Sequence, residues 1–295
     1  MADLIQVNRI YELKVGDMST GNGLLINNLQ VTFDISKTSS NKDKTNGATI
    51  EVYNLSDESL KLIDVDYPYA SFSAGYRDIG MKELFSGQVT NVTTRKNGTD
   101  RISQIMIGSA YTKLNHELIS RTLPPGSSVK QAYEELAKEI GITRTVFNTV
   151  NLDSNIIRGY PLSGTKRQML DELSKKYGMN WQIDGDTLYV ADADRGNSEK
   201  FEQAYVISKY TGLIENAYRE SGDIRRSKKD KVKKQSVVFK CLLNPDLVAG
   251  SIVKLEDTLI QGFYKIDELR HTGDWRGSSW YTECRCSAIE KVVAK

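Results

Sequence analysis

Alternation of apolar and polar side chains with a period of two recurs through the first and last thirds of this sequence, and it constrains the fold more than any other feature. Such a period is typical of β-strands that bury one face and expose the other. The runs are separated by turn formers such as Lys96-Asn97-Gly98, a strong hairpin signal. Predicted strands cover residues 24–35, 48–53, 69–76, 84–94 and 101–110 in the first third, and 204–208, 214–219, 235–243, 252–255, 262–269 and 279–287 in the last.

The middle of the chain changes to helical spacing. Segment 128–140 has apolar residues on one helical face and opens with Ser-x-x-Gln, the pattern of a capping box. Segment 165–177 has the same arrangement: it opens with the capping pattern Thr-x-x-Gln and ends before Gly178, a typical helix stop. A strand hairpin over 179–191 follows. The sequence therefore predicts a mainly β fold with a compact α+β module over residues 113–200.

Two polar loops are the candidate contact surfaces. Residues 36–47 (SKTSSNKDKTNG) are too polar for a core and predict a long exposed hairpin loop. Residues 225–234 (RRSKKDKVKK) hold seven basic residues and one acidic residue. No aromatic residue interleaves this run, which favours docking on a partner protein over stacking on single-stranded nucleic acid. The candidate interface residues are Lys37, Lys42, Lys44, Arg225, Arg226, Lys228, Lys229, Lys231, Lys233 and Lys234.

The outer thirds share a layout. Each has a polar loop, a strand that runs into an Asn turn (Asn54, Asn244), a strand that begins with Gly (Gly87, Gly262) and a charged hairpin that closes on Ser-Ala. The spacings differ, so the match is one of layout and not of sequence. Two explanations stay open: an internal duplication, or two unrelated antiparallel domains that share common features.

Composition excludes several classes of protein. A chain of 295 residues with 39% hydrophobic residues can bury the cores of two or three domains. Its 40 Lys+Arg against 38 Asp+Glu give a net charge of +2, which argues against a surface devoted wholly to nucleic acid. The longest apolar stretches are too short to span a membrane, and residues 1–10 lack a signal-peptide pattern. Three cysteines without a CxxC pair indicate synthesis in a reducing compartment.

Catalytic and metal-binding motifs are missing from the sequence. No HExxH, GxSxG, Walker loop or dinucleotide glycine fingerprint occurs, so we predict no enzyme and no cofactor. His271 precedes Cys284 and Cys286, but this spacing lacks the tight knuckle of a zinc site and predicts no metal. His116, Cys241 and Cys284 are expected to be packing residues.

Several segments, taken in their order along nearly the whole chain, resemble a known family. That family is the central baseplate hub proteins of contractile-tailed bacteriophages. The segments are 46–56 (NGATIEVYNLS), 84–89 (LFSGQV), 170–173 (LDEL), 181–183 (WQI), 187–190 (TLYV), 247–255 (LVAGSIVKL), 262–266 (GFYKI) and 271–282.

The resemblance implies a structural protein without catalytic residues. Two tail-tube-like antiparallel β-barrel domains, 1–112 and 201–295, would flank the α+β module 113–200. Three copies would form a ring whose six barrels match the sixfold tail tube, while the other side holds the threefold central spike and a channel is left for DNA. The implied partners are further copies of the chain, the tail tube or tube initiator protein, the spike, the tape measure and other baseplate proteins. The implied place is the virion tail baseplate, after synthesis and assembly in the host bacterial cytoplasm.

The alternative functions differ from this one in stoichiometry, in ligand or in the site that they require. A tail-tube initiator, or the hub of a related contractile injection system, would share the barrel but differ in stoichiometry. A nucleic-acid-binding protein would use residues 225–234. A tail-associated wall-degrading enzyme would need paired carboxylates across a cleft or a zinc site, and the sequence contains neither arrangement.

Overall fold

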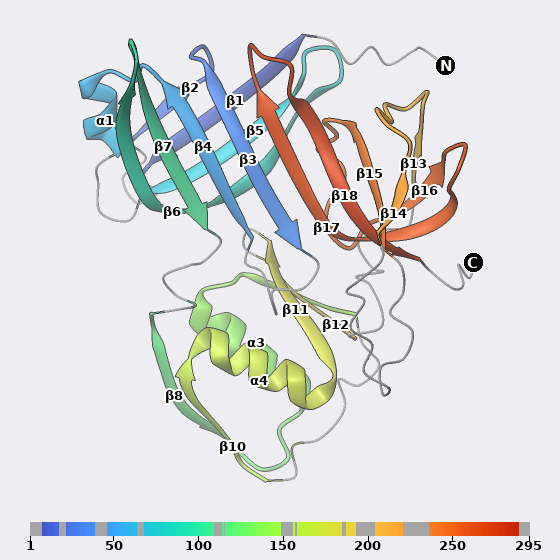
Figure 1. The fold of residues 1–295 in the computed structure, drawn as a ribbon. Coiled ribbons are helices and arrows are strands. Elements are labelled where there is room, and N and C mark those ends of the chain that lie inside the picture. The colour runs from blue at the N-terminus through green and yellow to red at the C-terminus, as the bar shows by residue number, and fades with distance from the viewer. Residues whose placement is uncertain are drawn as a thin grey trace.

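Most of the described chain lies in β-strands. The computed structural model describes residues 8–17, 22–38, 46–63, 68–108, 114, 116–148, 156, 158–184, 187–192, 204–220 and 236–288, and every structural statement below concerns these residues. Two helices of twelve residues lie in the middle of the chain, below a large sheet in Figure 1. The predicted fold class, mainly β with a small α+β module, is confirmed.

The first third forms seven strands and one short helix that share a buried core. Its strands pair in the order β3-β4-β7-β6-β5-β1-β2, and every pair is antiparallel. Because β6 pairs first with β5 and then with β7, the sheet folds over, and β5 crosses behind β3 and β4 in Figure 1. The elements are β1 (Arg9–Gly16), β2 (Gly23–Ile26), β3 (Val31–Thr38), β4 (Gly47–Tyr53), α1 (Asp57–Ile63), β5 (Tyr69–Tyr76), β6 (Gly80–Asn97) and β7 (Asp100–Gly108).

The middle module packs its two helices against short strands around a core of its own. Both predicted capping boxes are present, because the Ser128 and Thr165 side chains each accept the backbone N–H three residues on. Gly141 and Gly178 end the helices in the left-handed conformation, with φ of 82° and 66°. The elements are β8 (Leu118–Leu123), α3 (Val129–Ile140), β9 (Arg144–Asn148), β10 (Tyr160–Thr165), α4 (Lys166–Tyr177), β11 (Met179–Asp184) and β12 (Thr187–Asp192).

The last third returns to β structure. Its strands pair in the order β14-β15-β18-β17-β16-β13, and Cys241, Cys284 and Cys286 are buried in its core. The pair β13·β16 is parallel, whereas the sequence predicted antiparallel pairing throughout. The elements are β13 (Tyr205–Ser208), β14 (Tyr218–Glu220), β15 (Ser236–Leu242), β16 (Ile252–Glu256), β17 (Gln261–Asp274) and β18 (Trp280–Ala288).

Strands β1–β7 form the first β part and strands β13–β18 form the second. A joint between β3 and β17 merges the two β parts into one sheet of 13 strands. Seven residue pairs form this joint, from Glu268 opposite Thr38 to Asp274 opposite Thr32. The strands therefore do not close into two separate hydrogen-bonded barrels, which differs from the expectation. The physical reason is that the edge of β3 that is not paired with β4 pairs with β17, and not with another strand of the first β part. The backbone N–H and C=O groups along that edge are therefore not left free.

Each β part has the same strand order around its long hairpin. The series β3-β4-β7-β6-β5 matches β14-β15-β18-β17-β16, and all eight pairings are antiparallel. Of the two interpretations that the sequence left open, this agreement favours the internal duplication. The polar segment between β3 and β4 and the segment between β14 and β15, which includes residues 225–234, then lie at matching places along the chain.

Backbone details of the two long hairpins also match. The register shifts by one residue at Thr90 in β6 and at Asp267 in β17. Val89, before the bulge in β6, donates its N–H to the carbonyl oxygen of Pro68, just before β5, at 2.8 Å. Ile266, before the bulge in β17, donates its N–H to the carbonyl oxygen of Ser251, just before β16, at 2.9 Å. Two unrelated antiparallel sheets would not be expected to share both the bulge and this hydrogen bond.

Arg9 connects the first strand to the last hairpin. Its guanidinium donates to the carbonyl oxygens of Asp274, Gly277 and Ser278 at 3.2, 2.6 and 3.3 Å. It also lies 5.5 Å from the centre of the Trp280 ring. These contacts therefore hold β1 against the β17–β18 hairpin, although the residues are more than 260 positions apart in the chain.

Several predicted element boundaries are wrong. Residues 36–38 belong to β3 and residue 47 to β4, so the predicted loop 36–47 is shorter than expected. The strand predicted at 214–219 is reduced to β14. Strands β1, β8, β9 and β10 were not predicted, and His116, expected to pack inside, is exposed.

Candidate assembly surfaces

Of the ten predicted interface residues, only Lys37 lies in the described part of the chain. Lys42, Lys44 and the basic residues of 225–234 lie outside the described residues. The structure places Lys37 in β3, where it is buried, with its ammonium 5.7 Å from the centre of the Phe85 ring. Its alkyl stem is therefore inside the first β part, and any role of Lys37 in contacts with another chain stays a prediction.

A small polar pocket lies beside Lys37, where β3, β17, β18 and β14 meet. It has a volume of about 190 Å³, and its wall includes Glu268, Arg270, Glu283 and Arg285. Arg270 makes a bidentate ion pair with Asp34 across the β3·β17 joint. This ion pair thus supports the pairing of the two β parts.

His271 lies on the buried face of the same joint. Its ring is fully buried, and Nδ1 lies 2.8 Å from the Thr282 hydroxyl. Burial, with a smaller contribution from the Lys37 ammonium, lowers the pKa of His271 from 6.5 to about 3. The imidazole is therefore neutral at physiological pH and packs as a polar core residue, not as a proton carrier.

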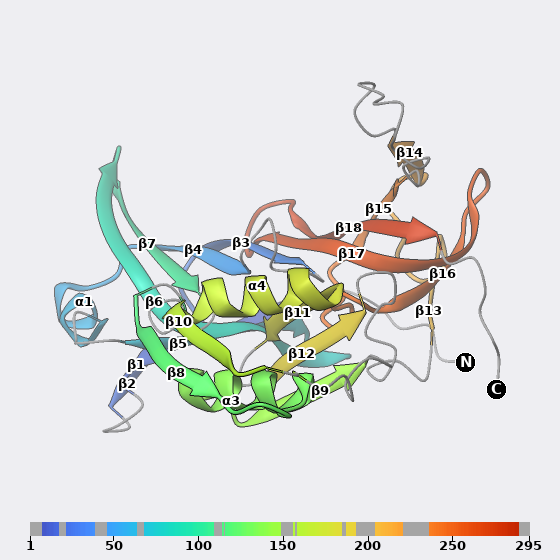
Figure 2. The ribbon, with the colours of Figure 1, turned by 90° about the horizontal axis from the view of Figure 1, so that it is seen from below.

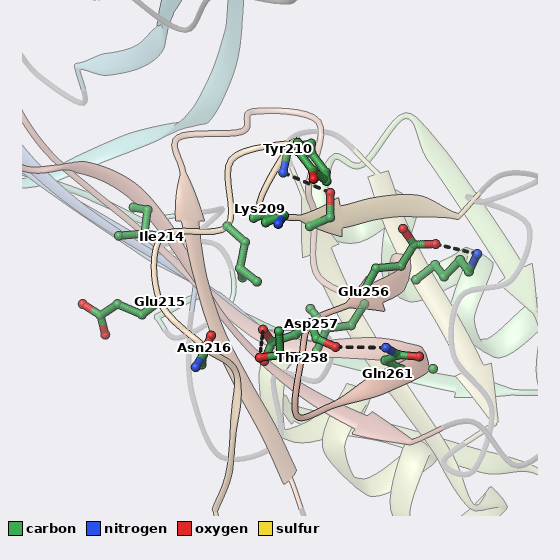
Figure 3. Close-up of a pocket in the computed structure, with 14 residues that line it drawn as sticks. Lys209, Tyr210, Ile214, Glu215, Asn216, Glu256, Asp257, Thr258 and Gln261 are labelled. Carbon is green, nitrogen blue, oxygen red and sulfur yellow. Dashed lines mark hydrogen bonds and ion pairs between the residues drawn. The ribbon is translucent and has the colours of Figure 1, made fainter.

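A wider groove of about 740 Å³ opens between the β13–β14 connection and the β16–β17 hairpin (Figure 3). Most of its polar groups already bind one another: Lys254 pairs with Glu256 at 2.7 Å, and the Gln261 amide donates to the Asp257 carbonyl at 3.2 Å. The Asp257 carboxylate accepts the N–H of Ala217 at 3.0 Å, which holds the two walls together. The Thr258 hydroxyl also donates to the Asp257 carboxylate, at 3.4 Å, so this carboxylate is held within the wall of the groove.

Exposed apolar side chains cluster near this groove. Tyr210 on its rim is 86% exposed, and Leu259 in the β16–β17 turn is 73% exposed. Lys209 lies 4.8 Å from the centre of the Tyr210 ring. Exposure of large apolar side chains around a groove is typical of a surface that contacts another protein. Sequence reasoning missed this surface, because single apolar residues in turns carry no periodic signal.

The middle module contacts the large sheet through Asn46. This buried side chain accepts the N–H of Thr38 at 2.9 Å and donates to the carbonyl of Ile183, in β11, at 3.1 Å. Asn46 therefore fixes the end of the loop after β3 and connects the first β part to the α+β module.

Neither metal ligands nor a membrane span emerge from the described residues. No three His, Cys, Asp or Glu side chains in this part of the chain gather where they could hold a metal ion. None of the helices that we describe has the length and apolar character needed to cross a bilayer.

The fold is that of phage tail proteins. A 43 kDa tail protein of prophage MuSo2 from Shewanella oneidensis is similar with a TM-score of 0.66 and 10% identity, over 95% of this chain and 98% of that one. A tail protein from Neisseria meningitidis MC58 gives 0.65 and 13%, over 95% and 97%. The c3393 protein of E. coli, described as a type VI secretion component similar to the T4 tail proteins gp27 and gp5, gives 0.63 and 10%, over 89% and 74%.

The family model of Baseplate hub gp41 matches residues 13–286, and the chain belongs to this family. No match was found among curated proteins. The resemblance that the sequence motifs indicated is confirmed, and the protein is a structural component of the bacteriophage tail baseplate.

Proposed function

We propose that this protein is a homotrimeric hub that joins the sixfold tail tube to the threefold central spike and leaves a channel for DNA. One observation carries this proposal: a single chain contains two β parts with the same strand order and the same bulge. Three such chains offer six similar units to a sixfold tube while keeping threefold symmetry for a spike.

The proposal includes three domains, 1–112, 113–200 and 201–295, and a purely structural role. In the groove between the β13–β14 connection and the β16–β17 hairpin, Lys254 pairs with Glu256 and Asp257 binds the backbone of Ala217, which supports a role in contacts rather than in catalysis. Its partners would be the tube or tube initiator, the spike, and neighbouring baseplate proteins. It would assemble in the host bacterial cytoplasm and remain in the virion of a contractile tail.

The mass of the purified protein tests the proposal. Light scattering would be measured on the protein alone and mixed with its spike. A mass of three subunits in either sample supports the hub. Six subunits would instead support the tube-initiator alternative, and a monomer in both samples would refute the trimer.

The polar residues of 36–47 that lie between β3 and β4, and the basic residues 225–234, are proposed contacts with the neighbouring subunit or the tube ring. Because they occupy matching places after β3 and β14, three copies would present six polar loops in alternation. Deletion of residues 225–234 should leave the fold intact and weaken assembly onto the tube. Normal assembly of ring and tube with the deleted chain would exclude this contact.

A DNA-binding function is the second candidate, because residues 225–234 concentrate the positive charge of the chain. Binding of short duplex DNA that weakens steeply with salt would favour it. The hub proposal expects no such binding at physiological salt, since DNA only passes through the channel.

A further inference from the structure

The outer half of β6 has an open edge. Every residue from Thr90 to Asn97 is exposed, on both faces of the hairpin. One edge of this stretch pairs with β7, and no strand in the described part of the chain pairs with the other. A row of free backbone N–H and C=O groups on an exposed strand is a ready template for another strand.

The matching stretch of β17 is paired on both edges. Aligning the two bulges places Asn91–Asn97 of β6 on Glu268–Asp274 of β17. The latter stretch pairs with β18 on one side and with β3 on the other, and its side chains alternate between buried and partly exposed. The same structural position is therefore covered in the second β part and open in the first.

The complementary edge is β14. In strand order β14 corresponds to β3, and it ends the sheet with one edge paired to β15 and the other open within the described residues. The pairings of β4 and β15 align Tyr218–Glu220 with Asp34–Ser36 of β3. Figures 1 and 2 show β14 and the outer half of β6 at opposite ends of the molecule.

We propose that β14 of one copy pairs with the outer half of β6 in the next copy, repeating between chains the joint that β3 and β17 make within the chain. The inference rests on the proposed trimer and adds the surface and register that build it. Transfer of the β3·β17 register places Thr93 opposite Glu220, Thr94 opposite Arg219 and Arg95 opposite Tyr218.

The side chains brought together are compatible with this register. Arg95, which pairs with Glu51 within its own chain, would lie opposite the exposed Tyr218 ring. It would also lie diagonal to Glu220, which pairs with Arg285 within its chain, so the joint would add a second cation beside that carboxylate. The intrachain joint also has a diagonal ion pair, between Arg270 and Asp34. Because each copy offers one edge of each kind, the contact is head-to-tail and closes a ring when the rotation allows it.

Cysteine cross-linking tests the register. The double variant Thr94→Cys with Arg219→Cys places two thiols directly opposite each other, at a Cα separation that a disulfide spans. The natural cysteines are buried and should not interfere. Mild oxidation should give covalent trimers on a non-reducing gel. Thr94→Cys with Glu215→Cys is the control, because residue 215 lies four positions out of register, and it should give no more cross-linking than either single variant.

Hydrogen exchange of the unmodified protein gives a second measurement that no substitution can disturb. Amides of residues 91–97 and 218–220 should exchange at least tenfold more slowly in the assembled particle than in the dissociated chain. Amides of α3 and α4 should exchange alike in both states.

The outcomes separate this joint from the function on which it rests. A trimer by light scattering without the cross-link, and without protection of residues 91–97, would overturn the joint and leave the hub standing. A monomer at all concentrations, alone and with spike, would overturn both. Cross-linked trimers with protection of both segments would support both.

Discussion

His271 illustrates how one buried side chain sets a pH response for the whole chain. Its pKa of about 3 in the folded protein lies below its usual 6.5 because burial disfavours the charged ring. Between these two values the unfolded chain binds a proton that the folded chain does not. Stability is therefore full above pH 6.5 and falls as the pH drops toward 3, by up to about 1.4 kcal/mol per pH unit.

We predict that His271→Gln flattens this acid dependence, because the substituted side chain does not titrate. The measurement is the free energy of unfolding by urea at several pH values between 4 and 7. His116→Gln is the matched control, since His116 is exposed, and it should keep the slope of the unmodified protein. Equal slopes for all three proteins would show that His271 is not the group responsible.

The three thiols give a second prediction at this scale. Burial raises the pKa of Cys241 to about 12 and the pKa values of Cys284 and Cys286 well above the ordinary range. Because the thiolate is the reactive form, the folded protein should not react with Ellman's reagent at pH 8, whereas the unfolded protein should release three equivalents. Rapid reaction of the folded protein would contradict their burial.

Single residues were predicted from sequence with uneven success. Cys241 and Cys284 were expected inside and are inside, because thiols within strand patterns usually pack. Lys37 was assigned to an exposed loop because its neighbours are polar, yet the strand β3 continues through it. Local polarity does not reveal that a lysine stem packs against an aromatic ring.

At the scale of elements, the β3·β17 joint depends on a residue without a side chain. Gly273 lies opposite Phe33 on one side and Trp280 on the other, and these two rings pack with their centres 5.2 Å apart. A Cβ at position 273 would lie 2.2 Å from the Phe33 ring. The glycine therefore makes room for two aromatic side chains from neighbouring strands.

We predict that Gly273→Ala destabilises the protein by about 1–3 kcal/mol, the usual range for overpacking a core. Gly47→Ala is the matched control in β4, because the nearest atom to a Cβ there lies 3.6 Å away, an ordinary contact. It should change stability by less than about 1 kcal/mol. Urea unfolding followed by tryptophan fluorescence measures both, and equal effects would refute the packing argument.

Elements with strong local signals were predicted well. Helices α3 and α4 begin and end where their capping residues indicated, since a capping box is a local contact. Strands β6 and β17 extend beyond the predicted runs. In each, a bulge shifts the two-residue period, so the second half of the strand does not continue the pattern of the first.

At the scale of the whole molecule, Arg9 connects the two ends of the described chain. We predict that Arg9→Ala lowers the free energy of unfolding by about 1–3 kcal/mol, because it removes hydrogen bonds from a charged donor to three carbonyl groups. Arg77→Ala, in the exposed turn after β5, is the control and should have little effect. Equal free energies of unfolding for both variants would show that the Arg9 hydrogen bonds add nothing to stability.

The overall division into a β part, an α+β module and a β part could be predicted from periodicity alone. The joint between β3 and β17 could not, because their pairing joins residues more than 200 positions apart and each strand alone looks like any half-buried strand. The motifs that resembled a baseplate hub implied two barrels, and only the register shows that they share a sheet.

The row of paired residues between β3 and β17 also has a mechanical consequence. Hydrogen bonds in an antiparallel pair run across the strands, so a pull along the strand direction loads the seven residue pairs together. A pull at right angles loads the end pair first and opens the row one step at a time. The two β parts thus resist sliding past each other far more than peeling apart, and a tail that transmits force along these strands would find the chain stiff in that direction.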